Sequence, residues 1–371
     1  MNFTLGAVNA VQKWGKIMNK IYYDIADDIK AYPDAWLYIV MSGRGPGKTY
    51  SSLKYAMLNN KKFCFLKRTI DDVNLMCKRA SDNESDGDVS PFVPINRDLG
   101  TCIKPVKVSK GYGAFYPCEL IDEKYTPAGD LIGWVTAVSM IEDVKGFNML
   151  PDLLIFDEFS PKPWERINRK EGDAILDLYE TLSRDRVKRG EGELKFIATG
   201  NTVNINAPLL LTLELVDDVV EMKVKGEEYR YIDGILIHLL SNKYTVDQEN
   251  LTGIQRRMMN TKWGKMAYKG DFGYNDFSHV GKISIKGYIP LYGIIHGNIV
   301  FYVYRKGKEY YITLSAQKVK QMYDLNIEQQ QKEFYLKNQL TLLNAFVNDN
   351  VHFETYTAYD LILNYKKYYN V

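Results

Sequence analysis

The sequence predicts an α/β fold built on a mostly parallel sheet, followed by a linker and a smaller α+β domain. Short apolar segments alternate with helical patterns through residues 36–199, which is typical of repeated βαβ units. Closely spaced strand patterns with Gly-containing turns run through 282–313, and helical patterns follow them. A polar stretch separates the two regions. The expected domains are 1–240 and 269–371, with a linker at 241–268.

The first βα unit is the best defined element of the predicted sheet. An apolar strand at 36–41 leads through a Gly-rich turn into a helix at 49–58. An acidic loop is expected at 81–88. The other expected elements of this domain are strands at 61–68, 134–140, 153–156 and 195–199, a helix at 174–182, and β-like segments at 218–224 and 229–239. In the second domain we expect strands at 282–286, 289–296, 298–304 and 308–313 and helices at 325–346 and 354–369.

Composition excludes some classes of function. The formal net charge is only +2, so any contact with nucleic acid must come from local basic patches. No apolar run approaches the ~20 residues needed to cross a bilayer, so we expect no membrane partner. The cysteines at 64, 77, 102 and 118 have neither the spacing of a zinc site nor the density of a disulfide framework, which favours a reducing cytoplasm.

A glycine-rich segment between the first strand and the first helix matches the P-loop pattern, except that a serine stands where the first glycine usually lies. Backbone amides at such a turn cradle phosphates, the lysine reaches the β and γ oxygens, and the hydroxyl after it ligates magnesium. The proline lacks an amide and removes one donor. A glycine-rich turn without a ligand is the plainer alternative. The predicted ATP-binding residues are Ser42, Gly43, Arg44, Gly45, Pro46, Gly47, Lys48 and Thr49, with Thr49 also a magnesium ligand.

The strand at 153–156 ends in two adjacent carboxylates, Asp157 and Glu158. Because successive side chains of a strand point in different directions, the two can have different roles. We expect Asp157 to hold magnesium through its water shell and Glu158 to orient and deprotonate an attacking water. A water nucleophile indicates hydrolysis of ATP. Without the P-loop upstream, two solvated loop carboxylates would be the default interpretation.

Two further groups of residues are candidates for contact with the γ-phosphate. Thr199 and Asn201 lie at the end of a strand, where doubly wound sheets bind their ligands, although a plain strand-to-turn connection fits as well. Arg184 and Arg186 follow a helical pattern. Either one could be an arginine finger that reaches a neighbouring subunit, or both could belong to a solvated basic face.

Together these residues resemble the DNA-packaging ATPases of small tailed bacteriophages with protein-primed linear genomes, which are relatives of the large terminase subunits. The resemblance spans nearly the whole chain. The motifs that carry it are Gly43-Arg44-Gly45, Lys67-Arg68, Gly133-Trp134, Ser139, Lys145, Phe156-Asp157-Glu158-Phe159, the Arg184 and Arg186 pair, Asn201, and the stretch 343–348 followed by Phe353.

The resemblance implies an ASCE-type P-loop ATPase domain, a small helical linker and an RNase H-like C-terminal domain. It implies a homo-oligomeric ring, with a pentamer expected, on the portal (connector) vertex of an empty procapsid in the host cytoplasm. ATP and Mg²⁺ would be the cofactors, double-stranded DNA the cargo, and a packaging RNA a further partner. In such a ring Arg184 would be the finger acting in trans, and Lys145 a second trans-acting cation.

The C-terminal domain departs from a nuclease in one respect. Its opening hairpin at 289–304 contains no Asp or Glu, although an RNase H-type nuclease usually places its first metal-binding carboxylate on the opening strand. We therefore expect a vestigial nuclease domain without cleavage activity. Candidate DNA contacts are Lys104, Lys107 and Lys110 beside Tyr112, and Lys282 with Lys286, although each of them also fits a solvated surface lysine.

Other functions stay open at this point. A nucleotide kinase shares the P-loop but needs an arginine-rich lid, and the sequence shows no clear one. A structural protein of the phage vertex could bind a nucleotide for assembly alone, but Glu158 would then have no role. A helicase also uses a P-loop, yet we find no separate set of aromatic motifs for binding single strands.

Overall fold

The computed structural model describes residues 22–81, 89–122, 124–141, 149–161, 170–201, 205, 207–241, 252–261, 264, 279–369 and 371. Its contacts divide the chain into two compact units. The first contains the described residues of Met1–Pro163, Lys170–Thr212 and Met222–Gly273, and the second those of Leu213–Glu221 and Tyr274–Val371. The second unit therefore begins close to the predicted boundary, but it also includes a short segment from the predicted ATPase domain.

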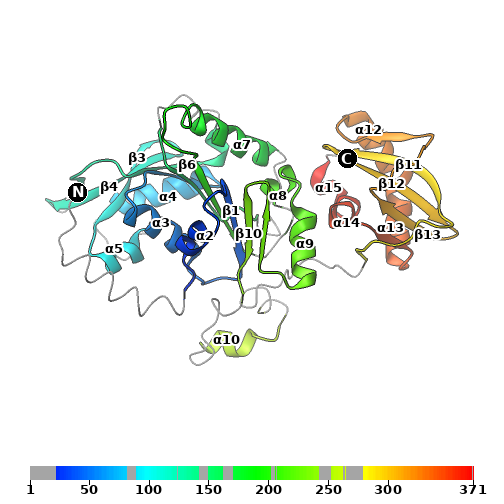
Figure 1. Cartoon of the computed structure of the whole chain (residues 1–371), viewed down its shortest axis with the longest axis horizontal. Coiled ribbons are helices and arrows are strands. Elements are labelled where there is room, and N and C mark those ends of the chain that lie inside the picture. The colour runs from blue at the N-terminus through cyan, green and yellow to red at the C-terminus, as the bar shows by residue number, and fades with distance from the viewer. Residues whose placement is uncertain are drawn as a thin grey trace. The chain divides into compact units, whose positions relative to one another are not determined.

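Figure 1 shows the first unit, with many of its elements labelled. Its helices are α2 (Ile25–Ala31), α3 (Lys48–Leu58), α4 (Ile70–Ser81), α5 (Val93–Leu99), α7 (Lys170–Ser183), α8 (Pro208–Thr212) and α10 (Gly253–Met258), with a 3-10 turn at Val138–Met140. Its strands are β1 (Leu37–Ser42), β2 (Phe63–Lys67), β3 (Ile103–Ser109), β4 (Tyr112–Ile121), β5 (Lys124–Pro127), β6 (Gly133–Ala137), β7 (Leu153–Asp157), β8 (Lys195–Asn201), β9 (Tyr229–Ile232) and β10 (Ile235–Leu239).

One large sheet runs through this unit in the order β3-β4-β6-β2-β7-β8-β1-β10-β9, and β5 pairs with β4. The pairs from β6 to β10 are all parallel, whereas the pairs at both edges are antiparallel. The prediction of a mostly parallel α/β sheet is confirmed. Because the central strands are parallel, the carboxyl ends of β1, β2, β7 and β8 lie at one edge of the sheet, where such folds bind ligands.

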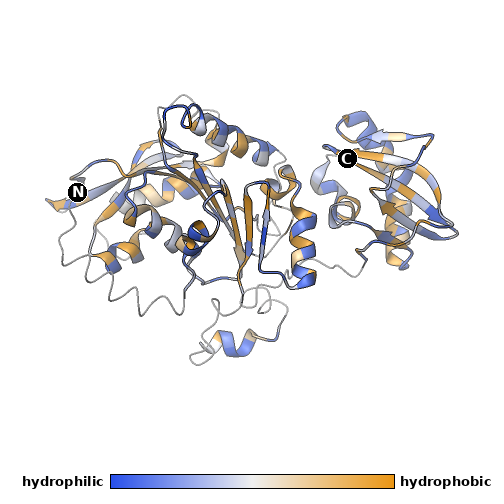
Figure 2. Cartoon of the chain, viewed as in Figure 1, coloured by the Kyte–Doolittle hydropathy of each residue, from blue (hydrophilic) through white to orange (hydrophobic). Residues whose placement is uncertain are grey.

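Helices cover both faces of this sheet, which explains why its central strands are apolar throughout (Figures 1 and 2). On one face α3, α4 and α5 pack around a core that includes Leu53, Phe65 and Ile95. On the other face the ring of Tyr179, from α7, packs against Phe196 of β8 at a centroid distance of 6.3 Å. No helix among the described residues is long and apolar enough to span a membrane.

The second unit is an α+β domain, as predicted. Its strands β11 (Ile289–His296), β12 (Ile299–Lys306), β13 (Glu309–Thr313), β14 (Met322–Asp324) and β15 (Val351–Phe353) form a sheet in the order β14-β11-β12-β13-β15. The helical segments are α12 (Glu328–Phe334), a π-helical turn (Tyr335–Gln339), α13 (Leu340–Val347), α14 (Tyr356–Leu363) and α15 (Tyr365–Tyr368). The first three strands form an antiparallel meander, and each edge strand adds in parallel.

Two predicted strands are wrong. The segment at 218–224 belongs to helix α9 (Val216–Lys225), because buried Val216, Val219 and Val220 recur at helical spacing and the acidic first turn and basic last turn suit the helix dipole. The segment at 282–286 forms no strand. Its alternating pattern looks like one, but the amide of Ile283 donates to the Tyr311 hydroxyl at 3.2 Å instead of to a strand neighbour.

Candidate nucleotide and magnesium site

The P-loop joins the end of β1 to the start of α3. Gly45 and Gly47 have φ angles of +92° and +89°, a region that side chains with a β-carbon rarely adopt, so both positions require glycine. Ser42 ends β1 and is fully buried, and Arg44 is exposed beside it. The carbonyl of Pro46 accepts a hydrogen bond from the Tyr23 amide at 3.0 Å, which ties the loop to the segment before α2.

Lys48 points into the site from the first turn of α3. Its ammonium donates to Ser42 Oγ at 2.6 Å, to the Gly43 carbonyl at 3.1 Å and to Asn201 Oδ1 at 3.2 Å. An ammonium has three donors, so Ser42, Gly43 and Asn201 together supply an acceptor for each. Burial lowers the pKa of Lys48 to about 7, although the carboxylates of Asp157 and Glu158 act in the opposite direction. Asn201 ends β8, so this contact places the end of β8, where a γ-phosphate contact was predicted, beside the P-loop.

Asp157 stands at the end of β7 among hydroxyl and ammonium donors. Its Oδ1 accepts from the Thr49 hydroxyl at 2.6 Å and from the Thr199 hydroxyl at 3.1 Å, and Lys67 Nζ lies 2.6 Å from Oδ2. Burial would raise the pKa of Asp157, but the Lys67 charge and the hydrogen bonds from Lys67, Thr49 and Thr199 outweigh it and hold the pKa below its usual value. Asp157 is therefore ionised at neutral pH.

The residues around Asp157 fit a magnesium ion. Thr49 Oγ1 and the Asp157 carboxylate are hard oxygen donors that converge within 2.6 Å of one another, and Mg²⁺ prefers such ligands. Lys67 already balances the charge on Oδ2. Because Lys67 already contacts Oδ2, this oxygen is better placed to hold Mg²⁺ through a water ligand than by direct contact.

Glu158, the predicted base, follows Asp157 in an unusual backbone conformation. Its φ angle is +60°, which is uncommon for a residue other than glycine, and its side chain is exposed. The next residue, Phe159, is fully buried, and its amide donates to the Thr199 carbonyl at 3.0 Å. The turn after β7 thus directs Glu158 outward while β8 holds the residue that follows it.

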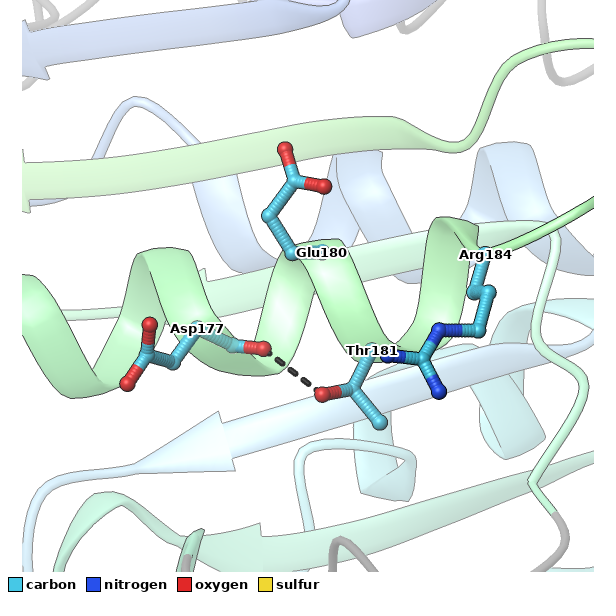
Figure 3. A pocket seen from close by; sticks show the side chains of 4 residues that line it. All are labelled: Asp177, Glu180, Thr181 and Arg184. Carbon is cyan, nitrogen blue, oxygen red and sulfur yellow. Dashed lines mark hydrogen bonds between the residues drawn. The ribbon is translucent and has the colours of Figure 1, made fainter.

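The two candidate finger arginines lie in different environments. Arg184 follows the last turn of α7 and is exposed. It lines a surface cavity of about 340 Å³ together with Asp177, Glu180 and Thr181, and Figure 3 shows its guanidinium near Thr181, whose hydroxyl donates to the Asp177 carbonyl at 2.8 Å. An exposed arginine at a helix end is free to reach a molecule outside this chain.

Arg186 is instead buried, with 3% of its surface exposed. Its guanidinium donates to the Pro151 carbonyl at 2.7 Å and to Asp152 Oδ1 at 3.2 Å, and it pairs with Glu191 at 3.5 Å. The expectation that Arg186 reaches a neighbouring subunit is not supported, because the group would have to leave these partners. It holds the segment before β7 against the turn after α7.

Lys145 lies outside the described residues. Sequence reasoning assigned no role to Lys67, to Arg68 or to Glu171, which pairs with Arg68 at 2.6 Å. The signal available for the first two was a pair of cations at the end of an apolar strand pattern. Glu171 lies a hundred residues away, and no motif marks it.

Comparisons with known proteins identify the family and the fold of this chain. The family model for the podovirus DNA encapsidation protein (Gp16) matches residues 120–364, about two thirds of the chain. No curated protein is similar enough to count as a match. A solved structure of the bacteriophage Phi-29 viral genome packaging motor assembly aligns with a TM-score of 0.60 at 18% identity, covering 94% of this chain and 99% of that one.

A second structure, of the Phi-28 gp11 DNA packaging motor, gives a TM-score of 0.57 at 17% identity and covers 94% of this chain and 96% of its own. At such identities the two structures establish a shared fold. The family model supplies the membership. The P-loop at 42–49 lies outside the matched range and is therefore evidence separate from the family match. The chain belongs to the podovirus DNA encapsidation protein (Gp16) family.

Proposed function

We propose that this chain is the ATPase of a motor that moves double-stranded viral DNA into a preformed procapsid, hydrolysing ATP to ADP and phosphate with Mg²⁺. The chain belongs to a family of encapsidation proteins, and one observation of its site supports this proposal. Lys48, Thr49, Asp157 and Asn201 meet at the carboxyl ends of β1, β7 and β8, with Glu158 beside them. This arrangement binds a nucleoside triphosphate and supplies a base for water.

The roles of the site residues follow from their positions. The P-loop amides and Lys48 bind the β and γ phosphates, and Asn201 orients the Lys48 ammonium by accepting a hydrogen bond from it. Thr49 and Asp157 are the residues that would hold Mg²⁺, whose chemistry is to neutralise charge on the phosphate oxygens. Glu158 orients the attacking water and takes its proton. The exposed carboxylate of Glu158 is available for this because the left-handed turn aims it away from the core.

The motor is proposed to work as a homo-oligomeric ring, with a pentamer expected, on the portal vertex in the host cytoplasm. Arg184 is the proposed finger in trans, since it is exposed and lies at the end of a helix. Lys145 stays a second proposed cation on the resemblance alone. A packaging RNA is a further proposed partner.

DNA contacts are proposed on exposed lysines. Lys107 and Lys110 are exposed on the β3–β4 hairpin. Lys104 is instead buried, and its ammonium lies 4.2 Å from the centroid of the Tyr125 ring, in a cation–π contact. Lys104 is therefore a poorer candidate than its neighbours. In the second unit Lys286 is exposed, and Lys282 lies 3.4 Å from Glu354.

We also propose that the C-terminal domain does not cut DNA. Neither β11 nor β12 carries an Asp or Glu, the residue types that a two-metal nuclease site needs on these strands. A nuclease assay with manganese tests this, with Asp324→Asn as the control, because Asp324 ends β14 and pairs with Ile295 of β11. Cleavage that the control abolishes would overturn the proposal.

The first experiment is ATP hydrolysis by the purified protein with and without double-stranded DNA, at several protein concentrations. We expect DNA to stimulate turnover, activity to rise faster than linearly with protein, and Glu158→Gln and Arg184→Ala to reduce turnover to a small residual rate. Binding should weaken steeply with salt and ignore sequence, because a motor grips phosphates. Turnover only with an acceptor nucleotide would indicate a kinase. Nucleotide binding without turnover would indicate a structural protein of the vertex.

A further inference from the structure

Arg68 lies just after β2, beside the turn that carries Glu158. Its Nη1 donates to Glu171 Oε1 at 2.6 Å and to Oε2 at 2.8 Å. Its Nη2 donates to the carbonyl of Phe159 at 2.6 Å and to that of Glu158 at 3.2 Å. One planar guanidinium therefore joins the ends of two neighbouring strands to the first turn of α7.

The turn that Arg68 holds is one that needs support. Glu158 has a φ angle of +60°, and such a conformation persists in a residue with a side chain only where its surroundings fix it. Besides the two bonds from Arg68, the amide of Phe159 bonds to Thr199, and its ring packs so closely on Gly200 that a β-carbon there would lie 2.6 Å from Cε1. Strand, arginine and aromatic ring together fix the turn.

The geometry points to Arg68 as a positioning residue for hydrolysis, with Glu171 as the carboxylate that orients it. This inference rests on the proposed role of Glu158 as the base. Arg68 acts on the backbone of Glu158, and the direction of the Glu158 carboxylate depends on that backbone. A base displaced by about 1 Å loses on the order of a hundredfold in rate, so a small change in this turn has a large effect on turnover.

The pair also ties the site to the helix that ends in the finger. Glu171 lies in the first turn of α7 and is 6% exposed, and Arg184 follows the last turn of the same helix. Movement of α7 along its axis would therefore reach the Glu158 carbonyl through one buried ion pair. The pair Arg68–Glu171 thus connects α7 to the turn after β7.

The variant that tests this is Arg68→Lys in the full chain. Lysine keeps the charge opposite Glu171, but a single ammonium cannot pair with Glu171 and also bond both carbonyls in the same geometry. Arg68→Ala is a poor test, because it removes the charge opposite the buried Glu171 carboxylate and threatens folding. The matched control is Arg230→Lys. Arg230 lies on β9 and pairs with Glu227 at 2.6 Å, and 16% of its side chain is exposed, compared with 18% for Arg68.

We expect Arg68→Lys to lower the rate of hydrolysis roughly 10- to 100-fold while the Kd for a fluorescent ATP analogue with Mg²⁺ changes less than about twofold. In a Glu158→Gln background the same change should have no further effect on turnover, since the base is already gone. Equal losses in binding and hydrolysis, or full additivity with Glu158→Gln, would overturn the inference. Arg230→Lys should leave every readout as in the wild type.

A second readout needs no turnover and separates this inference from the proposed function. Amide hydrogen exchange over residues 157–160 should be faster in Arg68→Lys than in the wild type or Arg230→Lys, because the turn has lost two of its bonds. Unchanged exchange sinks the positioning role even if the protein hydrolyses ATP. Faster exchange supports the structural part of the inference even if ATP hydrolysis is absent.

Discussion

Arg184 and Arg186 show how much two nearby residues of one type can differ. Removing the Arg186 side chain leaves the buried Pro151 carbonyl without this donor and breaks the ion pair with the partly exposed Asp152, so we expect Arg186→Ala to lower the free energy of unfolding by about 3 kcal/mol. Urea denaturation followed by circular dichroism measures this. Arg184→Ala is the control, since an exposed side chain contributes little stability, and we expect it to change that free energy by less than about 0.5 kcal/mol.

The two variants should also differ in activity. Arg184→Ala should lose at least about a thousandfold in DNA-stimulated hydrolysis, as expected for a finger. Arg186→Ala should retain hydrolysis at a temperature where it is still folded. A stable Arg186→Ala protein with no hydrolysis would return Arg186 to the list of candidate fingers and contradict the structural role assigned to it.

Lys48 gives a pH prediction. Burial lowers its pKa to about 7, so in the free protein the ammonium is charged below pH 7 and mostly neutral above it. Bound phosphates favour the charged form and raise the pKa, so ATP binding should take up a proton above pH 7 and weaken by up to about tenfold per pH unit there. Calorimetry of Glu158→Gln with MgATP at pH 8, in buffers of different ionisation enthalpy, measures the uptake. Affinity that is constant from pH 6.5 to 8.5 would show that Lys48 stays charged.

At the residue scale, sequence reasoning found the groups that lie in contiguous motifs. The P-loop residues, Asp157 and Glu158 are spaced by the chain itself, so their types and order predict the site. Lys67 and Glu171 belong to the same site through contacts across strands and helices. Those contacts depend on the strand order β2-β7-β8-β1, which a single sequence does not fix.

At the scale of elements, α7 packs on α8 so closely that only glycine fits between them. A β-carbon on Gly172 would lie 2.2 Å from Thr212 Oγ1 and 2.6 Å from the Pro208 carbonyl. Gly172→Ala must therefore move the helices apart, and we expect it to lower the free energy of unfolding by about 1–3 kcal/mol although alanine is the better helix former. Gly253→Ala, also helical but with open space around it, is the control and should be neutral or slightly stabilising.

Because Gly172 is the neighbour of Glu171, the same change should also disturb the Arg68 contact. Hydrolysis by Gly172→Ala should fall more than nucleotide binding. Thermal unfolding without ligand measures the loss of stability, and the shift that an MgATP analogue causes measures nucleotide binding. A protein with normal stability and normal turnover would show that α7 and α8 can separate without consequence for the turn after β7.

Element type was predictable where the pattern was long or followed by a motif, and failed where the pattern was short. The central strands were located because both faces are covered and the residues are apolar throughout. Helix α9 was mistaken for a strand because its valines favour strands and its apolar spacing is visible only over ten residues. The edge strands β3 to β5 were not predicted at all, since one end of β3 and most of β5 are exposed and their residues carry little pattern.

At the scale of the whole molecule, Arg184 and Glu158 of one chain can act on two different bound nucleotides. Arg184 is exposed at the end of α7, whereas Glu158 stands at the end of β7. A ring built from head-to-tail contacts gives every subunit a neighbour on each side, so a finger from one subunit can complete the site of the next. This arrangement would make hydrolysis a property of the assembly.

Mixing two inactive variants tests the arrangement. In a mixture of Glu158→Gln with Arg184→Ala, a subunit that keeps Glu158 can receive Arg184 from a neighbour that lacks the base. If the finger acts in trans and sites work independently, an equal mixture should recover up to about a quarter of wild-type hydrolysis, because about one interface in four pairs the two intact residues. Glu158→Gln mixed with the double variant is the control and should stay inactive. No recovery in mixtures that form rings of normal size would place Arg184 within its own subunit's site, and would leave the contact between subunits to another cation.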